Sequence, residues 1–272
     1  MGRSEAEVKT ALRDLDGFLV DMDGVLYRDD TPLPGMQDFI RQLQSRDLPH
    51  LFLTNNSSRT PLQYAERLRA LGAAVSPERI LTSALVTAAY LSRAARAQDR
   101  VLVIGGPGLR AALLDVGLQL TEDPDAAEFV VMGLDRDVTY DKLARATRAV
   151  GRGARFLGTN ADRTLPAARG LEPGAGALLA AVEVASGVRP QVFGKPESPM
   201  FEQALRLLGT PPGRTAMIGD RYETDILGAQ RAGLVTIAVA TGVSAADWLR
   251  QQDPPPDHVF PSLLEVYEAL RK

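Results

Sequence analysis

Cysteine is absent from the 272-residue sequence. Its absence excludes disulfides, thiolate metal sites and cysteine nucleophiles together, and it fits a reducing compartment. Long apolar runs are also missing, so no segment is predicted to span a bilayer. The first ten residues, MGRSEAEVKT, hold no apolar stretch of the signal-peptide type. We therefore expect a cytoplasmic protein without a membrane partner.

Charge of either sign is not in large excess. The formal net charge is -3, so we expect no nucleic-acid partner. Lysine is scarce, because the basic residues are almost all arginine, and this makes each lysine conspicuous. Only two histidines occur, His50 and His258, and their places in or near predicted strands indicate structural roles. The four lysines are Lys9, Lys142, Lys195 and Lys272.

Short apolar runs alternate with helical patterns in the first part of the chain. Gly17 to Val20 and His50 to Leu53 are typical of buried strands. Residues 35–46 and 61–71 have the apolar spacing of helices. Strand, helix, strand, helix at this spacing predicts a parallel sheet with helices on its faces.

A second α/β pattern begins near Ser83, which is a candidate N-cap for a helix over 84–97. The first pattern resumes near Val192, and Trp248 in its late part is expected in the core. The second pattern predicts, in order, strand 101–104, helix 108–115, strand 129–132, helix 140–150, strand 155–157 and helix 175–185.

These two patterns predict an α/β protein with a Rossmann-like parallel-sheet core and an inserted α/β domain. We expect the core to comprise residues 1–82 and 190–272, and the insertion to comprise residues 83–189. The small-residue helix near 175–185 is expected either to pack internally or to form the face of a homodimer.

Polar groups follow four of the predicted strands. The segments are Asp21-Met22-Asp23-Gly24-Val25, Thr54-Asn55-Asn56-Ser57, Gly194-Lys195-Pro196 and the run from Gly219-Asp220 to Asp225. Ligands of open parallel sheets bind at the carboxyl ends of the strands, so these groups are expected to share one site.

The residue types suit phosphoryl transfer, which needs charge neutralisation and alignment. Asp21 can act as a carboxylate nucleophile, and with Asp220 it offers the hard oxygen ligands that suit Mg²⁺. Asp23 can serve as general acid and then as general base. Lys195 adds a fixed positive charge. Thr54 and Asn55 can donate hydrogen bonds to the phosphate oxygens. Gly24 permits a close approach of the backbone, whose N–H groups can point at the anion.

This set resembles the haloacid-dehalogenase-like (HAD) hydrolase superfamily, whose four motifs match DMDGV, TNN, GKP and GDRYETD in order. Within it the chain is similar to the NagD-like and p-nitrophenyl-phosphatase-like branch, which carries a large α/β cap. The resemblance covers about Gly17 to Phe260.

The resemblance implies roles for residues of these motifs. Asp21 is implied as nucleophile and metal ligand, with the backbone carbonyl of Asp23 and the carboxylate of Asp220 as the other protein ligands. Asp225 orients the metal shell directly or through water, although a helix cap is a competing interpretation. Thr54 and Asn55, with Asn56 beside them, bind phosphate or form no more than an Asx-type turn or a helix cap. Dehalogenases usually lack the second aspartate of DMDGV, so phosphatase is favoured.

One loop of the inserted domain resembles the family's substrate-specificity loop. It holds Asn160 and Asp162, and a structural turn is an equal alternative for it. Leu165 stands where vertebrate phosphoglycolate and pyridoxal phosphatases of this branch carry a substrate-contacting histidine. Their substrates therefore cannot be carried over to this chain.

The predicted function is Mg²⁺-dependent hydrolysis of a small phosphorylated metabolite through an aspartyl-phosphate. Esters of the p-nitrophenyl phosphate, sugar phosphate, phosphoglycolate, pyridoxal phosphate and nucleotide types all stay open. The first alternative is a phosphotransferase or mutase on the same scaffold. The others are a non-catalytic metabolite-binding regulatory protein and a nucleotide-binding oxidoreductase, although a dinucleotide fingerprint is missing.

Overall fold

The computed structural model describes residues 12–167, 170–242 and 244–271, so the segment MGRSEAEVKT lies outside the described residues. These residues form two compact units. The first unit contains the chain up to Thr54, Tyr64–Leu81 and the chain from Met200 onward, and the second contains Asn55–Gln63 and Thr82–Pro199. The predicted boundaries at 82/83 and 189/190 stay a prediction.

The first unit is built on a six-stranded sheet with the order β15-β14-β13-β1-β4-β5. β1 runs parallel to both β4 and β13, and β14 runs parallel to both β13 and β15. Its strands are β1 (Gly17–Asp21), β4 (His50–Thr54), β5 (Ile80–Thr82), β13 (Thr215–Gly219), β14 (Val235–Val239) and β15 (His258–Phe260). A two-stranded hairpin, β2 (Tyr27–Arg28) and β3 (Thr31–Pro32), follows β1.

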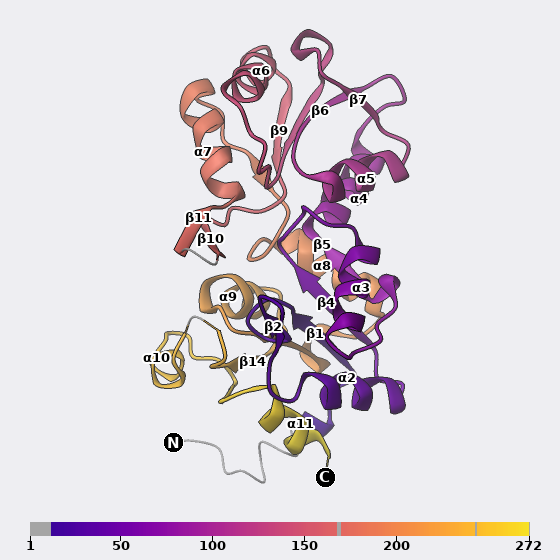
Figure 1. Cartoon of the computed structure of the whole chain (residues 1–272), viewed down its shortest axis with the longest axis vertical. Coiled ribbons are helices and arrows are strands. Elements are labelled where there is room, and N and C mark those ends of the chain that lie inside the picture. Colours follow the sequence, from indigo (N-terminus) through magenta and orange to yellow (C-terminus); the bar gives the residue numbers. More distant parts are fainter. Residues whose placement is uncertain (1–11, 168–169, 243, 272) are drawn as a thin grey trace. The chain divides into compact units, whose positions relative to one another are not determined.

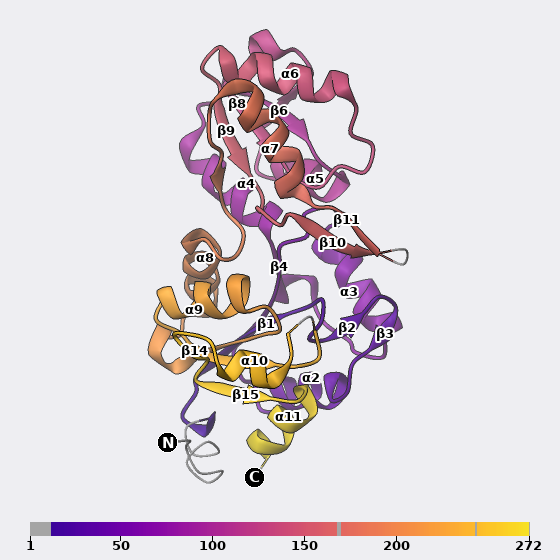
Figure 2. The ribbon, with the colours of Figure 1, turned by 90° about the vertical axis from the view of Figure 1, so that its left-hand side faces the viewer.

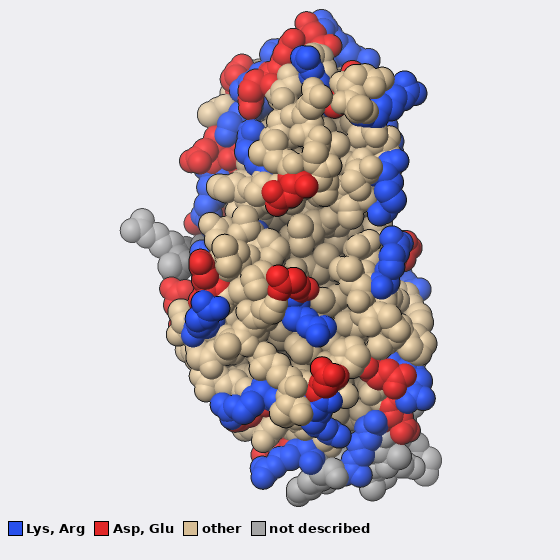
Figure 3. All heavy atoms as spheres, turned by 90° about the vertical axis from the view of Figure 1, so that its right-hand side faces the viewer, with Lys and Arg blue, Asp and Glu red and all other residues tan. Residues whose placement is uncertain are grey.

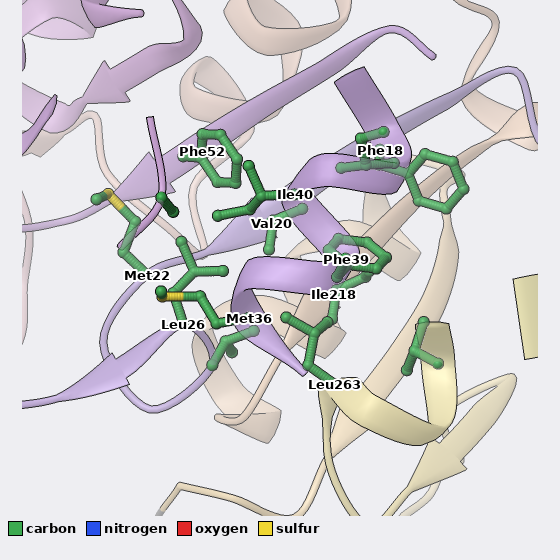
Figure 4. Packing of buried hydrophobic residues seen from close by; sticks show 14 of the residues in the cluster. Phe18, Val20, Met22, Leu26, Met36, Phe39, Ile40, Phe52, Ile218 and Leu263 are labelled. Carbon is green, nitrogen blue, oxygen red and sulfur yellow. The ribbon is translucent and has the colours of Figure 1, made fainter. Parts of the chain in front are cut away.

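Helices cover this sheet and bury its apolar side chains. Phe39 and Ile40 of α2 point at Phe18 and Val20 of β1 (Figure 4). The rings of Phe18 and Phe39 meet edge-on with centroids 6.2 Å apart. Each such fully buried side chain contributes about 1.5–3 kcal/mol to folding. The helices are α2 (Met36–Ser45), α3 (Pro61–Ala70), α8 (Ser198–Leu208), α9 (Leu227–Arg231), α10 (Ala246–Arg250) and α11 (Leu263–Arg271).

Trp248 is not the core residue that the sequence suggested. It lies on the short helix α10 and is 41% exposed. The next residue, Leu249, is the buried one, because consecutive helical residues face different directions. Trp248 still meets the buried ring of Tyr222 edge-on, with centroids 5.9 Å apart.

The second unit is built on a five-stranded parallel sheet with the order β12-β9-β8-β6-β7. Helices α6 and α7 cover one face and α4 and α5 the other (Figures 1 and 2). Its strands are β6 (Arg100–Ile104), β7 (Gln119–Thr121), β8 (Phe129–Met132), β9 (Arg155–Gly158) and β12 (Gln191–Val192). Its helices are α4 (Ser83–Ala94), α5 (Pro107–Asp115), α6 (Tyr140–Gly151) and α7 (Ala175–Ser186).

An antiparallel hairpin of β10 (Thr164–Ala167) and β11 (Gly170–Pro173) lies beside α7 (Figure 2). This hairpin was not predicted. One 3-10 turn of the second unit is Pro124–Ala126, and those of the first are Pro77–Arg79 and Pro212–Arg214.

The cap of helix α4 differs from the prediction by one residue. Thr82 is the N-cap: its backbone is extended, and its hydroxyl oxygen accepts a hydrogen bond from the Leu85 N–H at 3.3 Å. Ser83 is already helical, and its Oγ donates to the carbonyl of Asn55 instead. Both residue types can cap a helix, so sequence alone could not separate the neighbours.

The predicted α/β fold with parallel sheets is confirmed. None of the helices within the described ranges has the length and apolar character that a bilayer crossing requires.

Candidate active site

Three buried carboxylates gather in the first unit. One oxygen from each of Asp21, Asp220 and Asp225 lies within 4.8 Å of the others. All three side chains are at most 8% exposed. Carboxylate oxygens at such spacing are the hard donors that suit Mg²⁺ or Ca²⁺.

The parallel sheet explains how Asp21 and Asp220 come together although they lie far apart in the sequence. Asp21 ends β1, and Asp220 directly follows β13, the neighbouring strand. Val20 pairs with Ile218, so the two strands end at the same level. Because parallel strands place their carboxyl ends at one edge, the prediction from the strand ends holds for this pair.

Two glycines give the Asp220 carboxylate its room. A Cβ on Gly24, whose φ is +89°, would lie 2.6 Å from Asp220 Oδ2. A Cβ on Gly242 would lie 1.6 Å from the same oxygen. Both distances are far below a van der Waals contact, so only glycine fits at either position without displacing this carboxylate.

The Thr241-Gly242 segment is the part of this site that sequence reasoning missed. Thr241 Oγ1 donates to the Gly24 carbonyl at 2.6 Å, and Arg28 donates to the carbonyls of Thr241 and Gly242. The segment follows β14, which neighbours β13. The rule that polar groups gather at strand ends could therefore have found it, but it carries no acidic or basic side chain to draw notice.

Asp225 lies on a π-helical turn, Tyr222–Ile226. Its Oδ2 accepts a hydrogen bond from the Arg221 N–H at 3.1 Å. It reaches the carboxylate group because Gly219 has no side chain: a Cβ there would lie 2.2 Å from Asp225 Cβ. Asp225 thus bonds the backbone at the start of the turn and also lies in the carboxylate cluster, and its role toward a metal stays a prediction.

Asp23 follows Asp21 by two residues and is exposed, in contrast to the three clustered carboxylates. The turn that holds it is closed by a hydrogen bond from the Gly24 N–H to the Tyr27 carbonyl at 2.8 Å. Tyr27 is fully buried under the Arg67 guanidinium, which lies 4.3 Å from its ring centroid. Burial, and then the charge of Asp23, raises the pKa of Tyr27 well above its ordinary value, so its phenol stays protonated.

Thr54 ends β4, on the other side of β1 from β13, and is buried. Leu53 pairs with Asp21, so Thr54 lies at the same sheet edge as the nucleophile candidate. Asn56 belongs to the second unit, where its Oδ1 accepts from the N–H and the hydroxyl of Ser58 at 3.0 and 2.7 Å. These bonds form the Asx-type turn that the sequence left as one alternative.

Asn55 and Lys195 also belong to the second unit, and they are joined through the backbone of Lys195. Asn55 Oδ1 accepts from the Lys195 N–H at 2.8 Å, and Asn55 Nδ2 donates to the Lys195 carbonyl at 2.9 Å. The side chain of Lys195 is 2% exposed and that of Asn55 is 9% exposed.

The predicted specificity loop is hydrogen-bonded to Asn55, the partner of Lys195. Asn55 Nδ2 lies 3.2 Å from both carboxylate oxygens of Asp162, and Asn160 Nδ2 donates to the Asn55 carbonyl at 2.7 Å. Leu165 lies apart from these bonds on β10, opposite Glu172 of β11. Ser83 was predicted only as a helix cap, and its bond to the Asn55 carbonyl brings it into the same group.

Comparisons with known proteins agree with these motifs. Residues 18–119 match a family model described as haloacid dehalogenase-like hydrolase, and residues 192–266 match one described as HAD-hydrolase-like. An acid sugar phosphatase of Staphylococcus aureus (strain USA300) is 41% identical over 261 residues, which cover 96% of this chain and all of the relative.

Two solved structures show the same fold over nearly the whole chain. NagD from Escherichia coli K-12 is 33% identical with a TM-score of 0.86, covering 92% of this chain and 98% of its own. A glycerol phosphate phosphatase from Mycobacterium tuberculosis, solved in complex with magnesium, is 32% identical with a TM-score of 0.87. That match covers 96% of this chain and 77% of the other.

The chain therefore belongs to the haloacid dehalogenase-like hydrolase family. Within the family it is grouped with NagD and the p-nitrophenyl phosphatases, as the sequence motifs predicted.

Proposed function

We propose that this chain hydrolyses small phosphomonoesters with the help of Mg²⁺ and through a phosphoryl group carried on Asp21. The chain is a phosphoric monoester hydrolase of the haloacid dehalogenase-like class. One observation carries the finer proposal: three buried carboxylates lie within 4.8 Å of one another at the carboxyl edge of a parallel sheet. Carboxylates crowd in this way where a cation offsets their repulsion.

The residues present fit a magnesium ion. The carboxylates of Asp21, Asp220 and Asp225 would hold it, with the backbone carbonyl of Asp23. Because Gly24 and Gly242 carry no side chain, the Asp220 carboxylate has room to occupy this position. When bound, Mg²⁺ neutralises phosphate charge and orients the phosphoryl group. The magnesium complex of the M. tuberculosis relative supports this choice of metal.

The chemistry divides into two proton-balanced steps. A carboxylate oxygen of Asp21 forms a bond to phosphorus while the bond to the leaving alcohol breaks, and the Asp23 carboxyl gives that alcohol its proton. The Asp23 carboxylate then takes a proton from water, which attacks the same phosphorus and releases phosphate from Asp21. The exposure of Asp23 suits a group that must exchange protons with water.

The anionic phosphate needs fixed donors during both steps. We assign this role to the Lys195 ammonium, the Thr54 hydroxyl and the backbone near Gly24 and Asn55. The amide side chain of Asn55 is engaged with the Lys195 backbone, so Asn55 would serve the phosphate through its N–H.

A small phosphorylated metabolite of the sugar or polyol phosphate type is the proposed substrate. The supporting relatives are named acid sugar phosphatase and glycerol phosphate phosphatase. Leu165, Asn160 and Asp162 form the proposed specificity region. Lysines, arginines and acidic residues are interspersed on the face in Figure 3. We place the enzyme in the cytoplasm.

The test is a screen of phosphorylated metabolites with Mg²⁺, ranked by kcat/KM, for the wild type and Asp21→Asn. We expect turnover of sugar or polyol phosphates by the wild type, loss upon chelation with EDTA and recovery with Mg²⁺. Asp21→Asn should lose at least about a thousandfold in kcat because the amide cannot accept the phosphoryl group. Near wild-type turnover by this variant would contradict the nucleophile assignment.

Transfer to an acceptor other than water is the second candidate on this scaffold. Product analysis with and without added acceptor alcohols separates it from hydrolysis. Free phosphate in stoichiometric yield in both reactions supports a hydrolase, whereas a phosphorylated acceptor as the main product supports a transferase.

We also propose a homodimer through helix α7. Its inner face buries Ala175, Leu179 and Val182, while Val184 on the outer face is 85% exposed among small apolar neighbours. Exposed apolar patches of this kind mark association surfaces. Sedimentation of the wild type should show a dimer that Val184→Glu converts to monomer. A wild type that stays monomeric at high concentration would contradict the proposal.

A further inference from the structure

We propose that Asp162 and Asn55 are positioning residues for Lys195: Asp162 orients the Asn55 amide, and that amide holds the Lys195 backbone. The inference deepens the proposed function and rests on it, since it assumes that the Lys195 ammonium binds the phosphate. It assigns Asp162 a role different from the substrate contact that its place in the specificity loop suggested.

The Asn55 amide grips Lys195 at two points of opposite polarity. Its oxygen accepts from the Lys195 N–H at 2.8 Å, and its nitrogen donates to the Lys195 carbonyl at 2.9 Å. Gly194 makes this approach possible, because a Cβ there would lie 2.6 Å from Asn55 Oδ1. A two-point grip defines the direction in which the Lys195 side chain leaves the backbone.

The carboxylate of Asp162 favours one of the two orientations of the Asn55 amide. Both of its oxygens lie 3.2 Å from Asn55 Nδ2, and an ionised carboxylate only accepts hydrogen bonds. An amide turned by 180° would put Asn55 Oδ1 against this carboxylate and against the Lys195 carbonyl. The charge on Asp162 therefore disfavours the turned amide more strongly than a neutral acceptor would.

The remaining bonds fix the backbone of Asn55. Its carbonyl accepts from Asn160 Nδ2 at 2.7 Å and from Ser83 Oγ at 2.5 Å. Ser83 and Asn160 are at most 3% exposed. A satisfied buried polar network is rigid, so a change at Asp162 should reach Lys195 through the Asn55 amide.

This positioning role has a signature that a substrate contact lacks. Every phosphomonoester presents the same phosphate group to Lys195, so loss of positioning should lower kcat by one factor for all substrates. Loss of a contact to the leaving group should instead change the ranking of substrates.

The experiment compares wild type, Asp162→Ala and Asp162→Asn on the same panel of phosphorylated metabolites. Asp162→Ala is expected to lower kcat about tenfold to a hundredfold, equally for every substrate. Asp162→Asn keeps an acceptor of the same shape and should stay within about fivefold of the wild type. Asp141→Ala removes a carboxylate that is 71% exposed in the same unit and is the matched control.

Thermal melting of each variant separates misfolding from mispositioning. If Asp162→Ala does not fold, the isosteric Asp162→Asn is the test by itself. Its kcat relative to the wild type should then change by the same factor for every substrate of the panel. An altered substrate ranking in either variant, or Asp162→Ala within twofold of the wild type, overturns the inference.

A failure of the proposed function gives a different result, because the wild type itself would then turn over no phosphomonoester. Calorimetric titration with inorganic phosphate then still tests the inference. Weaker binding by Asp162→Ala than by wild type and Asp141→Ala supports it. Equal binding by all of them, or none by the wild type, overturns it.

Discussion

At the scale of single residues, the Asp220 carboxylate is confined more tightly than its partners. Gly24 and Gly242 both face its Oδ2, and Gly242 leaves no space for even one added carbon. Asp220 is a proposed metal ligand, and residues that touch it in this way would control where its carboxylate points. The site therefore depends on glycines that carry no chemistry of their own.

Gly242→Ala tests this dependence. The added Cβ would lie 1.6 Å from Asp220 Oδ2, so the carboxylate must move. We expect Mg²⁺ affinity, measured by calorimetry, to fall about tenfold to a hundredfold. Gly213→Ala is the control, because its Cβ would meet nothing within 4 Å. Unchanged affinity in Gly242→Ala would show that Asp220 tolerates displacement.

At the scale of the secondary-structure element, the start of helix α4 serves two purposes. Thr82 caps the helix, and Ser83 binds the Asn55 carbonyl. Thr82 therefore satisfies a free N–H of the first helical turn, and Ser83 supports the buried polar residues around Lys195. Its first turn cannot shift along the chain without losing one of these bonds.

Thr82→Ala should lower the free energy of unfolding by about 1 kcal/mol, because the Leu85 N–H loses its acceptor. Thr82→Ser keeps a hydroxyl at the same place and should recover most of this loss. Urea denaturation of the two variants and the wild type measures both effects. Equal stability of Thr82→Ala and the wild type would contradict the cap assignment.

At the scale of the whole molecule, a buried histidine makes folding stability depend on pH. His50 is 4% exposed within β4, where its Nδ1 donates to the Leu48 carbonyl at 2.7 Å. Burial lowers the pKa of His50 below 6.5, although the Leu48 carbonyl partly opposes this effect. The folded protein therefore keeps the ring neutral where the unfolded chain is already protonated.

The unfolded state binds more protons than the folded state below about pH 6.5. Stability should therefore fall as the pH drops through this value and stay constant with respect to His50 above it. We expect the difference in urea midpoint between pH 7.5 and pH 5.5 to be smaller for His50→Gln than for the wild type. The same difference in both proteins would show that His50 does not contribute.

Sequence patterns were enough for most of the elements and for the carboxylate cluster. Short apolar strands followed by polar residues predicted β1, β4 and β13, and they predicted that Asp21 and Asp220 meet. Local patterns were not enough for the β10–β11 hairpin, the exposed position of Trp248 or the cap of α4. In these cases neighbouring residues have similar intrinsic preferences, and distant packing decides between them.

What the sequence by itself determined is the family, the parallel α/β fold and the identity of the acidic residues. Each follows from residue type and from a spacing that forces strand ends to one edge of a sheet. Only the tertiary structure decided that Gly242 packs directly against the Asp220 carboxylate, and that the Asn55 amide is hydrogen-bonded to the Lys195 backbone. These close approaches and hydrogen bonds leave no local pattern, because they arise only when separate loops meet, as with Asn55 and Lys195, which are 140 positions apart.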